Sequence, residues 1–274
     1  MFYITPKPQT HLVREESVAQ YIYIYMKISF FTLFSAIFPI LLSGKTNGNT
    51  PNNVQKECNC GQKIIFFPGQ TVTEDCIERY GFDSFFSSQA IPDTIFDMMR
   101  GKSFKTYCTV EREELRYILC LHRDIKGVAH VGEMVVNKSI AADILEIFKE
   151  LFVNNYPIER MRLIDYWDAD DERAMTDNNS SSFNFRFISH TNTVSKHGKG
   201  LAVDINPLYN PYYKKLPNGT VVIEPAAGKP YLNRNRNFNY KIKKNDLCYR
   251  LFIKHGFKWG GNWTSVKDYQ HFEK

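Results

Sequence analysis

Residues 195–206 constrain the fold of this chain more than any other segment, because they join a glycine-rich turn to an alternating strand. Gly198 and Gly200 permit the chain to turn tightly directly after His197. From Gly200 to residue 206, apolar side chains alternate with small or polar ones, which predicts a strand. Asp204 is therefore expected to point away from the apolar face, with His197 on the turn that precedes it.

The rest of the pattern predicts an α+β fold with a small antiparallel sheet and flanking helices. Short strands are expected at residues 132–137 and 160–164, and helices at 139–151 and 246–254, with a loop at 168–182. Ser139 and Asp246 are the expected helix caps. Strands and helices do not alternate regularly, so we do not expect a doubly wound parallel sheet.

The N-terminal region has the layout of a secretory leader. Met26 and Lys27 precede an apolar run at residues 28–42, and small residues follow it. We expect residues 1–44 to be a signal peptide or, if uncleaved, a membrane anchor, with Met26 as the true start. The protein is therefore expected to be exported, to a periplasmic, cell-envelope or extracellular location.

The remaining chain is long enough for one sizeable domain. Residues 45–90 read as a linker and a cysteine-bearing lead-in, and residues 91–274 as the catalytic domain. The chain has six cysteines, and export would permit disulfides among them, but their pairing cannot be read from the sequence.

The charge balance narrows the class of partner. The formal net charge is +6 and the pI is about 8.9, which suits an anionic partner such as a wall polymer or a membrane surface. Lys and Arg are scattered among acids rather than gathered in a run, so a nucleic-acid partner is not expected. Membrane contact is expected only through an uncleaved leader, and the protein is expected to be a monomer.

Two separated segments supply residue types that suit a catalytic zinc ion. Such an ion needs three ligands from His, Asp or Glu and a fourth position open to water. His197 and Asp204 offer two ligands, and His271 near the C-terminus offers a third. Asp268, three residues before His271, could then act on the water as a general base.

These segments resemble the M15 peptidases, the D-alanyl-D-alanine carboxypeptidase and L-alanyl-D-glutamate peptidase group. The run SKHGKGLAVD at 195–204 is similar to the family signature S-x-H-x-x-G-x-A-x-D, and GFKWGGNWTSVKDYQHFE at 256–273 is similar to its W-G-G-x-W and D-x-x-H-F ending. The similarity extends over most of residues 91–274. It implies a hedgehog/DD-peptidase-like domain in which His197, Asp204 and His271 bind one zinc ion.

The resemblance implies further roles. Asp268 would be the general base, and Arg186 would bind the substrate carbonyl and stabilise the developing oxyanion, although a surface salt bridge is an equally good reading of Arg186. Ser195 and Trp263 would line the substrate pocket. One position departs from the family, which often has Asp where this chain has Asn262.

The resemblance leaves the scissile bond open. The motifs are common to a carboxypeptidase that removes terminal D-Ala, a D-Ala-D-Ala dipeptidase and an endopeptidase that cuts between L-Ala and D-Glu in peptidoglycan stem peptides. The alternative is a non-catalytic zinc-containing module for wall binding or signalling, since hedgehog domains share the scaffold. Asp268 favours the enzyme, because a binding module does not need a base. Residues 206–245 form a long insertion that is expected to shape the pocket.

Overall fold

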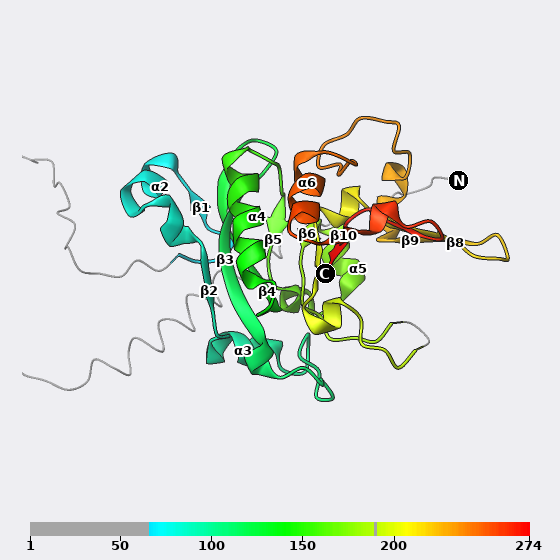
Figure 1. The fold of residues 1–274 in the computed structure, drawn as a ribbon, viewed down its shortest axis with the longest axis horizontal. Coiled ribbons are helices and arrows are strands. Elements are labelled where there is room, and N and C mark those ends of the chain that lie inside the picture. The colour runs from blue at the N-terminus through cyan, green and yellow to red at the C-terminus, as the bar shows by residue number, and fades with distance from the viewer. Residues whose placement is uncertain (1–65, 189–190) are drawn as a thin grey trace, which may run out of the picture. The chain divides into compact units, whose positions relative to one another are not determined.

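The protein is represented by a computed structural model that describes residues 66–188 and 191–274. Its main sheet is antiparallel, with four strands in the order β1–β4–β3–β2. These strands are β1 (Thr71–Val72), β2 (Ser87–Gln89), β3 (Leu115–Arg123) and β4 (Ala129–Asn137). β3 and β4 pair along their whole length and form the centre of the sheet (Figure 1).

Apolar side chains cover this sheet on both faces, which explains why β3 and β4 are almost continuously buried. Helix α4 (Ala141–Val153) lies along one face and buries Ile144, Ile147 and Phe148 against it. Helix α3 (Asp93–Met99) contributes to a second cluster, in which Met99 packs with Phe183 and Phe185.

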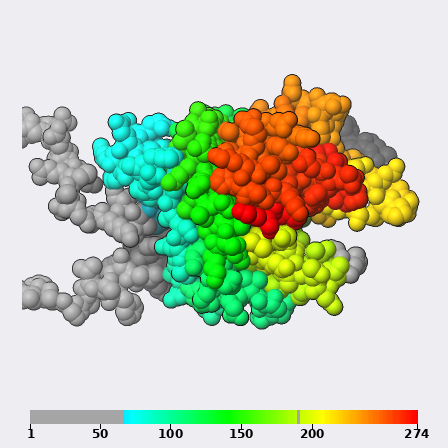
Figure 2. Space-filling view, in the orientation of Figure 1, coloured from blue at the N-terminus to red at the C-terminus, as the bar shows by residue number. Residues whose placement is uncertain are grey.

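The C-terminal part forms a second small sheet that shares the first core. Its order is β10–β12–β7, with β7 (Ala202–Asp204), β10 (Lys258–Trp259) and β12 (His271–Glu273). Helix α6 (Leu247–Lys254) packs beside α4, and its Phe252 stacks on Phe272 of β12 with ring centroids 4.1 Å apart. Figure 2 shows this C-terminal segment, in orange and red, lying against the green segment that contains α4.

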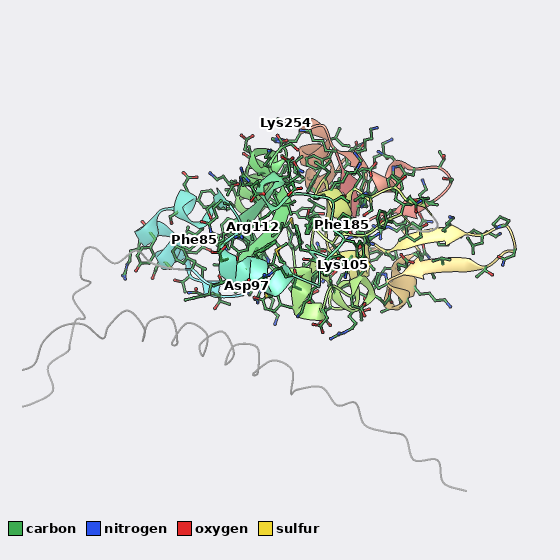
Figure 3. All side chains as sticks on the ribbon, turned by 90° about the horizontal axis from the view of Figure 1, so that it is seen from below. Phe85, Asp97, Lys105, Arg112, Phe185 and Lys254 are labelled. Carbon is green, nitrogen blue, oxygen red and sulfur yellow. The ribbon has the colours of Figure 1, made fainter. Side chains whose placement is uncertain are left out.

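A third sheet comes from the insertion predicted at residues 206–245. Strands β8 (Tyr212–Lys215) and β9 (Val221–Glu224) form a hairpin, and β8 also pairs with β11 (Lys267–Asp268). The tip of this hairpin projects from the body in both ribbon views (Figures 1 and 3). Its base therefore lies against the strand that carries Asp268.

The other elements are short. They are α2 (Glu74–Tyr80), α5 (Asp171–Thr176), the parallel pair β5 (Arg160–Met161) and β6 (Asn179–Ser180), and the 3-10 helices η1 (Phe82–Phe85), η2 (Arg112–Glu114), η3 (Ile164–Trp167), η4 (His197–Lys199), η5 (Pro207–Tyr209), η6 (Ala226–Tyr231) and η7 (Gly260–Asn262). No helix in the described residues is long and apolar enough to cross a bilayer.

The α+β prediction is confirmed, with corrections to individual elements. Helix α6 begins at the predicted cap, because the Asp246 side chain accepts a hydrogen bond from the backbone N–H of Tyr249. Ser139 does not cap α4, since its hydroxyl donates to the Asn137 side chain and Ile140 takes the cap position. The predicted loop at 168–182 is partly wrong, because Asp170 caps the short helix α5 there.

The described part of the predicted lead-in, residues 66–90, is packed into the same core as the rest. Val72 and Phe85 belong to the cluster that contains α4, and β1 and β2 are the outer strands of the main sheet. The predicted boundary at residue 91 therefore falls inside this folded unit. Cys76, Cys108, Cys120 and Cys248 form no disulfide with one another. The predicted leader and Cys58 and Cys60 lie outside the described residues.

Gly200 offers a test of the turn that precedes β7. Its φ is +68°, and an added Cβ would lie 2.7 Å from the backbone nitrogen of Asn137. Gly200→Ala should therefore lower the free energy of unfolding by ~3 kcal/mol, as measured by urea denaturation, because it combines backbone strain with overpacking. Gly219→Ala is the matched control, since Gly219 has φ +82° but open space around it. That control should lose ~1 kcal/mol, and equal losses would contradict a role for the Asn137 contact.

Candidate metal centre

The structure brings the three predicted ligands together through the pairing of β7 with β12. In this antiparallel register His271 lies directly opposite Asp204, and η4 places His197 just before β7. Nε2 of His197 lies 3.2 Å from Oδ2 of Asp204 and 3.1 Å from Nδ1 of His271. Nδ1 of His271 lies 3.2 Å from the other carboxylate oxygen of Asp204, Oδ1, so the three side chains form a triangle.

The size of this triangle fits a zinc ion. Ligand atoms about 2.0–2.1 Å from a tetrahedral zinc lie about 3.3 Å from one another. The three observed separations are close to that value, and the residues are two imidazoles and one carboxylate, which zinc accepts. Among the described residues, this is the one group of three or more His, Cys, Asp or Glu side chains with such convergence.

In each imidazole, the outer nitrogen, which is the one that faces away from the triangle, already has a hydrogen-bond acceptor. Nδ1 of His197 lies 2.7 Å from the carbonyl oxygen of Ser182, and Nε2 of His271 lies 3.2 Å from Oε2 of Glu273. If each outer nitrogen donates, the inner nitrogen of each neutral ring presents a lone pair to the centre. Such outer contacts hold metal-binding histidines in one tautomer and orientation.

Charge is concentrated at this buried point. Burial raises the pKa of Asp204, but His197 and His271 outweigh it and hold that pKa far below its ordinary value. Burial lowers the pKa of His271, yet its hydrogen bonds to Asp204 and Glu273 raise it to about 10. The carboxylates therefore favour positive charge at the centre, whether carried by a protonated imidazole or by a metal cation.

Asp268 lies beside this triangle on β11 and has a free oxygen. Its Oδ1 is buried and has no hydrogen-bond partner among the described residues. Burial raises the pKa of Asp268 to about 7, and the charge of Asp204 adds to this increase. The chain approaches it closely, because a Cβ on Gly260 would lie 2.7 Å from the Cβ of Asp268. A carboxylate with an open lone pair is what a general base requires.

The other predicted site residues, Trp263, Ser195 and Arg186, each make a contact of a different kind. The Trp263 ring lies 5.4 Å from the His271 ring, so it borders the triangle. The Ser195 hydroxyl accepts the backbone N–H of Gly198 at 2.9 Å, which stabilises the turn that carries His197. Arg186 pairs through Nε with Oδ2 of Asp171 at 2.8 Å. The substrate roles of all three stay predictions.

Two contributors to the site, Glu273 and Ser182, were not found by sequence reasoning. Glu273 could have been, because residues two apart on a strand share a face and Glu273 follows His271 by two. Ser182 contributes only a backbone carbonyl, which leaves no mark in the sequence. Tyr212 lies in the insertion that was expected to shape the pocket, but its place opposite Asp268 comes from the pairing of β8 with β11, which joins segments more than fifty residues apart.

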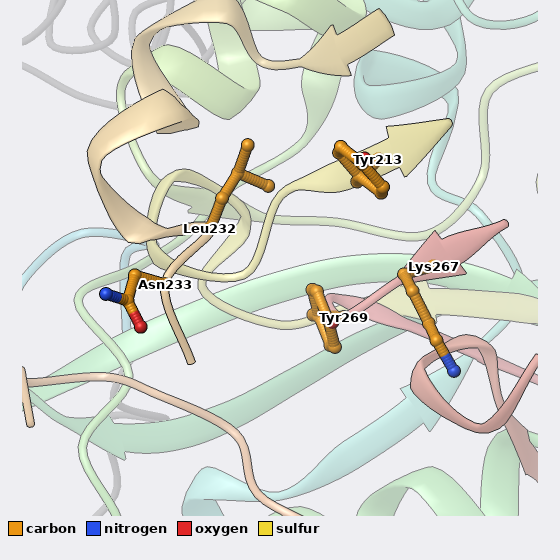
Figure 4. Close-up of a pocket in the computed structure, with 5 residues that line it drawn as sticks. All are labelled: Tyr213, Leu232, Asn233, Lys267 and Tyr269. Carbon is orange, nitrogen blue, oxygen red and sulfur yellow. The ribbon is translucent and has the colours of Figure 1, made fainter. Parts of the chain in front are cut away.

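A cavity of about 360 Å³ is lined in part by residues of β8 and β11. It is lined by Tyr213, Leu232, Asn233, Lys267 and Tyr269 (Figure 4). Lys267 and Tyr213 are cross-strand partners, and they point to the face opposite Asp268 because side chains alternate along a strand. The cavity is therefore separate from the three ligands.

Comparison with known proteins gives one match. Residues 189–274 match the model of a family described as D-alanyl-D-alanine carboxypeptidase, and the matched segment contains both sequence motifs. This match confirms the resemblance to the M15 peptidases, so residues 189–274 carry the pattern of a peptidase family. Neither the curated proteins nor the solved structures gave a match.

The outer contact of His271 can be tested by metal binding. Glu273→Gln removes the charge that polarises the imidazole, so it should weaken zinc affinity by about tenfold or more. Competition against a chromophoric chelator would measure this. Glu78→Gln is the control, because Glu78 is an exposed acid on α2, outside the triangle. Unchanged affinity in Glu273→Gln would show that Glu273 does not support the metal.

Proposed function

We propose that this chain is an exported zinc peptidase that hydrolyses peptide bonds in peptidoglycan stem peptides. His197, Asp204 and His271 would hold the ion. The observation that carries the proposal is the triangle itself, in which each pair of side chains approaches to 3.1–3.2 Å, through one carboxylate oxygen of Asp204 toward each imidazole, and each imidazole has an acceptor behind it. The family match over residues 189–274 supports the peptidase class.

The chemistry divides between the ion and the side chains. A zinc ion held there would supply Lewis acidity for the scissile carbonyl and for a nucleophilic water. Asp268 takes the proton from that water and passes it to the leaving amine, which its unpartnered Oδ1 permits. Burial keeps the pKa of Asp268 near neutrality, where a carboxyl group can both accept and return a proton.

Other residues would orient the substrate. Trp263 offers an aromatic wall beside His271. Arg186 would contact the substrate carbonyl or carboxylate, and its ion pair with Asp171 holds the guanidinium in a fixed place until the substrate arrives. Terminal D-Ala removal, D-Ala-D-Ala cleavage and L-Ala-D-Glu cleavage are all compatible with these residues.

Asp268→Asn separates catalysis from metal binding. The amide keeps the shape of the carboxylate but cannot accept the proton, so turnover should fall by about 10²–10⁴-fold while bound zinc is retained. The assay is mass spectrometry of the products from a pentapeptide stem, together with measurement of bound zinc. His197→Ala should lose both zinc and turnover. Full activity of Asp268→Asn would remove the proposed mechanism.

Export rests on the leader at residues 1–44 and is tested separately. The expected result is that the protein made in its native cell, or in a bacterial host with a secretion pathway, appears in the envelope or the medium. N-terminal sequencing should find an end just after the small residues that follow position 42, if the leader is cleaved. Recovery of uncleaved protein from the cytosol would contradict export.

A further inference from the structure

A row of three side chains extends the site away from the metal triangle. Asp268 of β11 lies opposite Tyr212 of β8, and Tyr212 lies opposite Glu224 of β9. Direct cross-strand partners point to the same face of a sheet, so the three side chains form one continuous row. The row begins at the buried, unpartnered Oδ1 of Asp268 and ends at Glu224, which is exposed.

The electrostatics agree with this placement. Burial raises the pKa of Tyr212, and the charges of Glu224 and Asp268 raise it further, so both carboxylates lie close to the phenol. Partial burial also raises the pKa of Glu224, while Arg186 opposes this effect. The row therefore connects the proposed general base to the region of Arg186.

The charge around Glu224 is predominantly negative. The groups that act on it are Arg186, Glu172 and Asp171, and Arg186 is already paired with Asp171. The carboxylate of Glu224 has no hydrogen-bond or ion-pair partner within 4.0 Å among the described residues, although Arg186 acts on it from farther away. A cation brought to this position would find an accessible carboxylate whose cationic neighbour, Arg186, is already paired with Asp171.

The base of the hairpin is fixed although its tip projects. Oε1 of Glu172, in the first turn of α5, accepts the backbone N–H of Ala226 at 2.7 Å, two residues after Glu224. The pairing of Tyr212 with Asp268 fixes the other strand. Glu224 is therefore held at a defined distance from the base, as a residue that selects substrates must be.

We propose that Tyr212 and Glu224 form a substrate-binding strip that selects peptides carrying a primary ammonium group. This inference rests on the proposed peptidase function and adds a preference within it. Two strand spacings separate Glu224 from Asp268, so the ammonium would lie about 10 Å from the scissile bond. A side-chain amine of a diamino acid or a free N-terminus can reach that position. Tyr212 would cover the peptide between the two carboxylates.

The test compares matched peptides on the zinc-loaded full chain. The substrates are a stem pentapeptide with lysine at its third position, the same peptide acetylated on the lysine amine, and the same peptide acetylated at the N-terminus. One of the two acetylations should lower kcat/KM by about fivefold, or ~1 kcal/mol, as expected for an accessible ion pair. Which one does so identifies the amine. Glu224→Gln should bring the ratio of kcat/KM between the free and the acetylated peptide close to one. Glu78→Gln should leave that ratio unchanged.

The outcomes separate this inference from the peptidase proposal. Cleavage without any preference between the peptides, or a preference that survives in Glu224→Gln, overturns the strip and leaves the peptidase proposal standing. If no peptide is cut, calorimetry on zinc-loaded Asp268→Asn measures the Kd of the free and of the acetylated peptides, and their ratio replaces the ratio of kcat/KM. A preference there that Glu224→Gln removes supports the strip while the peptidase proposal fails, and no preference overturns both.

Discussion

The register between β7 and β12 is the constraint on which the site depends. It sets His271 opposite Asp204, and a slip of one residue would turn one of the two ligands to the other face. The register is held by the core, because Phe272, next to His271, is fully buried and stacks on Phe252 of α6. Val203, the cross-strand partner of Phe272, is equally buried. Apolar packing on one face therefore positions polar ligands on the other.

The strands that carry Asp204 and His271 are too short to be stable alone, since β7 and β12 have three residues each. Their stability comes from the cluster that joins α4, α6 and the main sheet. The backbone also contributes directly, because the Ser182 carbonyl fixes His197 and Ser181 bridges Asp204. The region before residue 189, which lies outside the family match, thus supplies both the core and an outer contact of the site.

Local patterns in the sequence predicted part of this architecture. The alternation at residues 200–206 predicted β7, with Asp204 facing away from the core, and Asp246 marked the start of α6. The convergence of His197, Asp204 and His271 followed from two motifs, because residue type and order limit what they can bind. Strand β3 was missed because burial on both faces removes the alternation that marks a half-buried strand. Helix α5 was missed because its polar composition resembles a loop.

The part of the architecture that the sequence did not predict arises from pairing between segments far apart in the chain. No pattern within residues 206–245 shows that β8 will pair with β11, yet this pairing places Tyr212 and Glu224 in line with Asp268. Strand β11 also presents Lys267 to a cavity on the face opposite Asp268. Because the insertion is hydrogen-bonded to the strand that carries the proposed base, a change in the hairpin alters the surroundings of that base as well as the peptide that reaches it. Under the two proposals, substrate selection and proton transfer would therefore be coupled through the short strand β11.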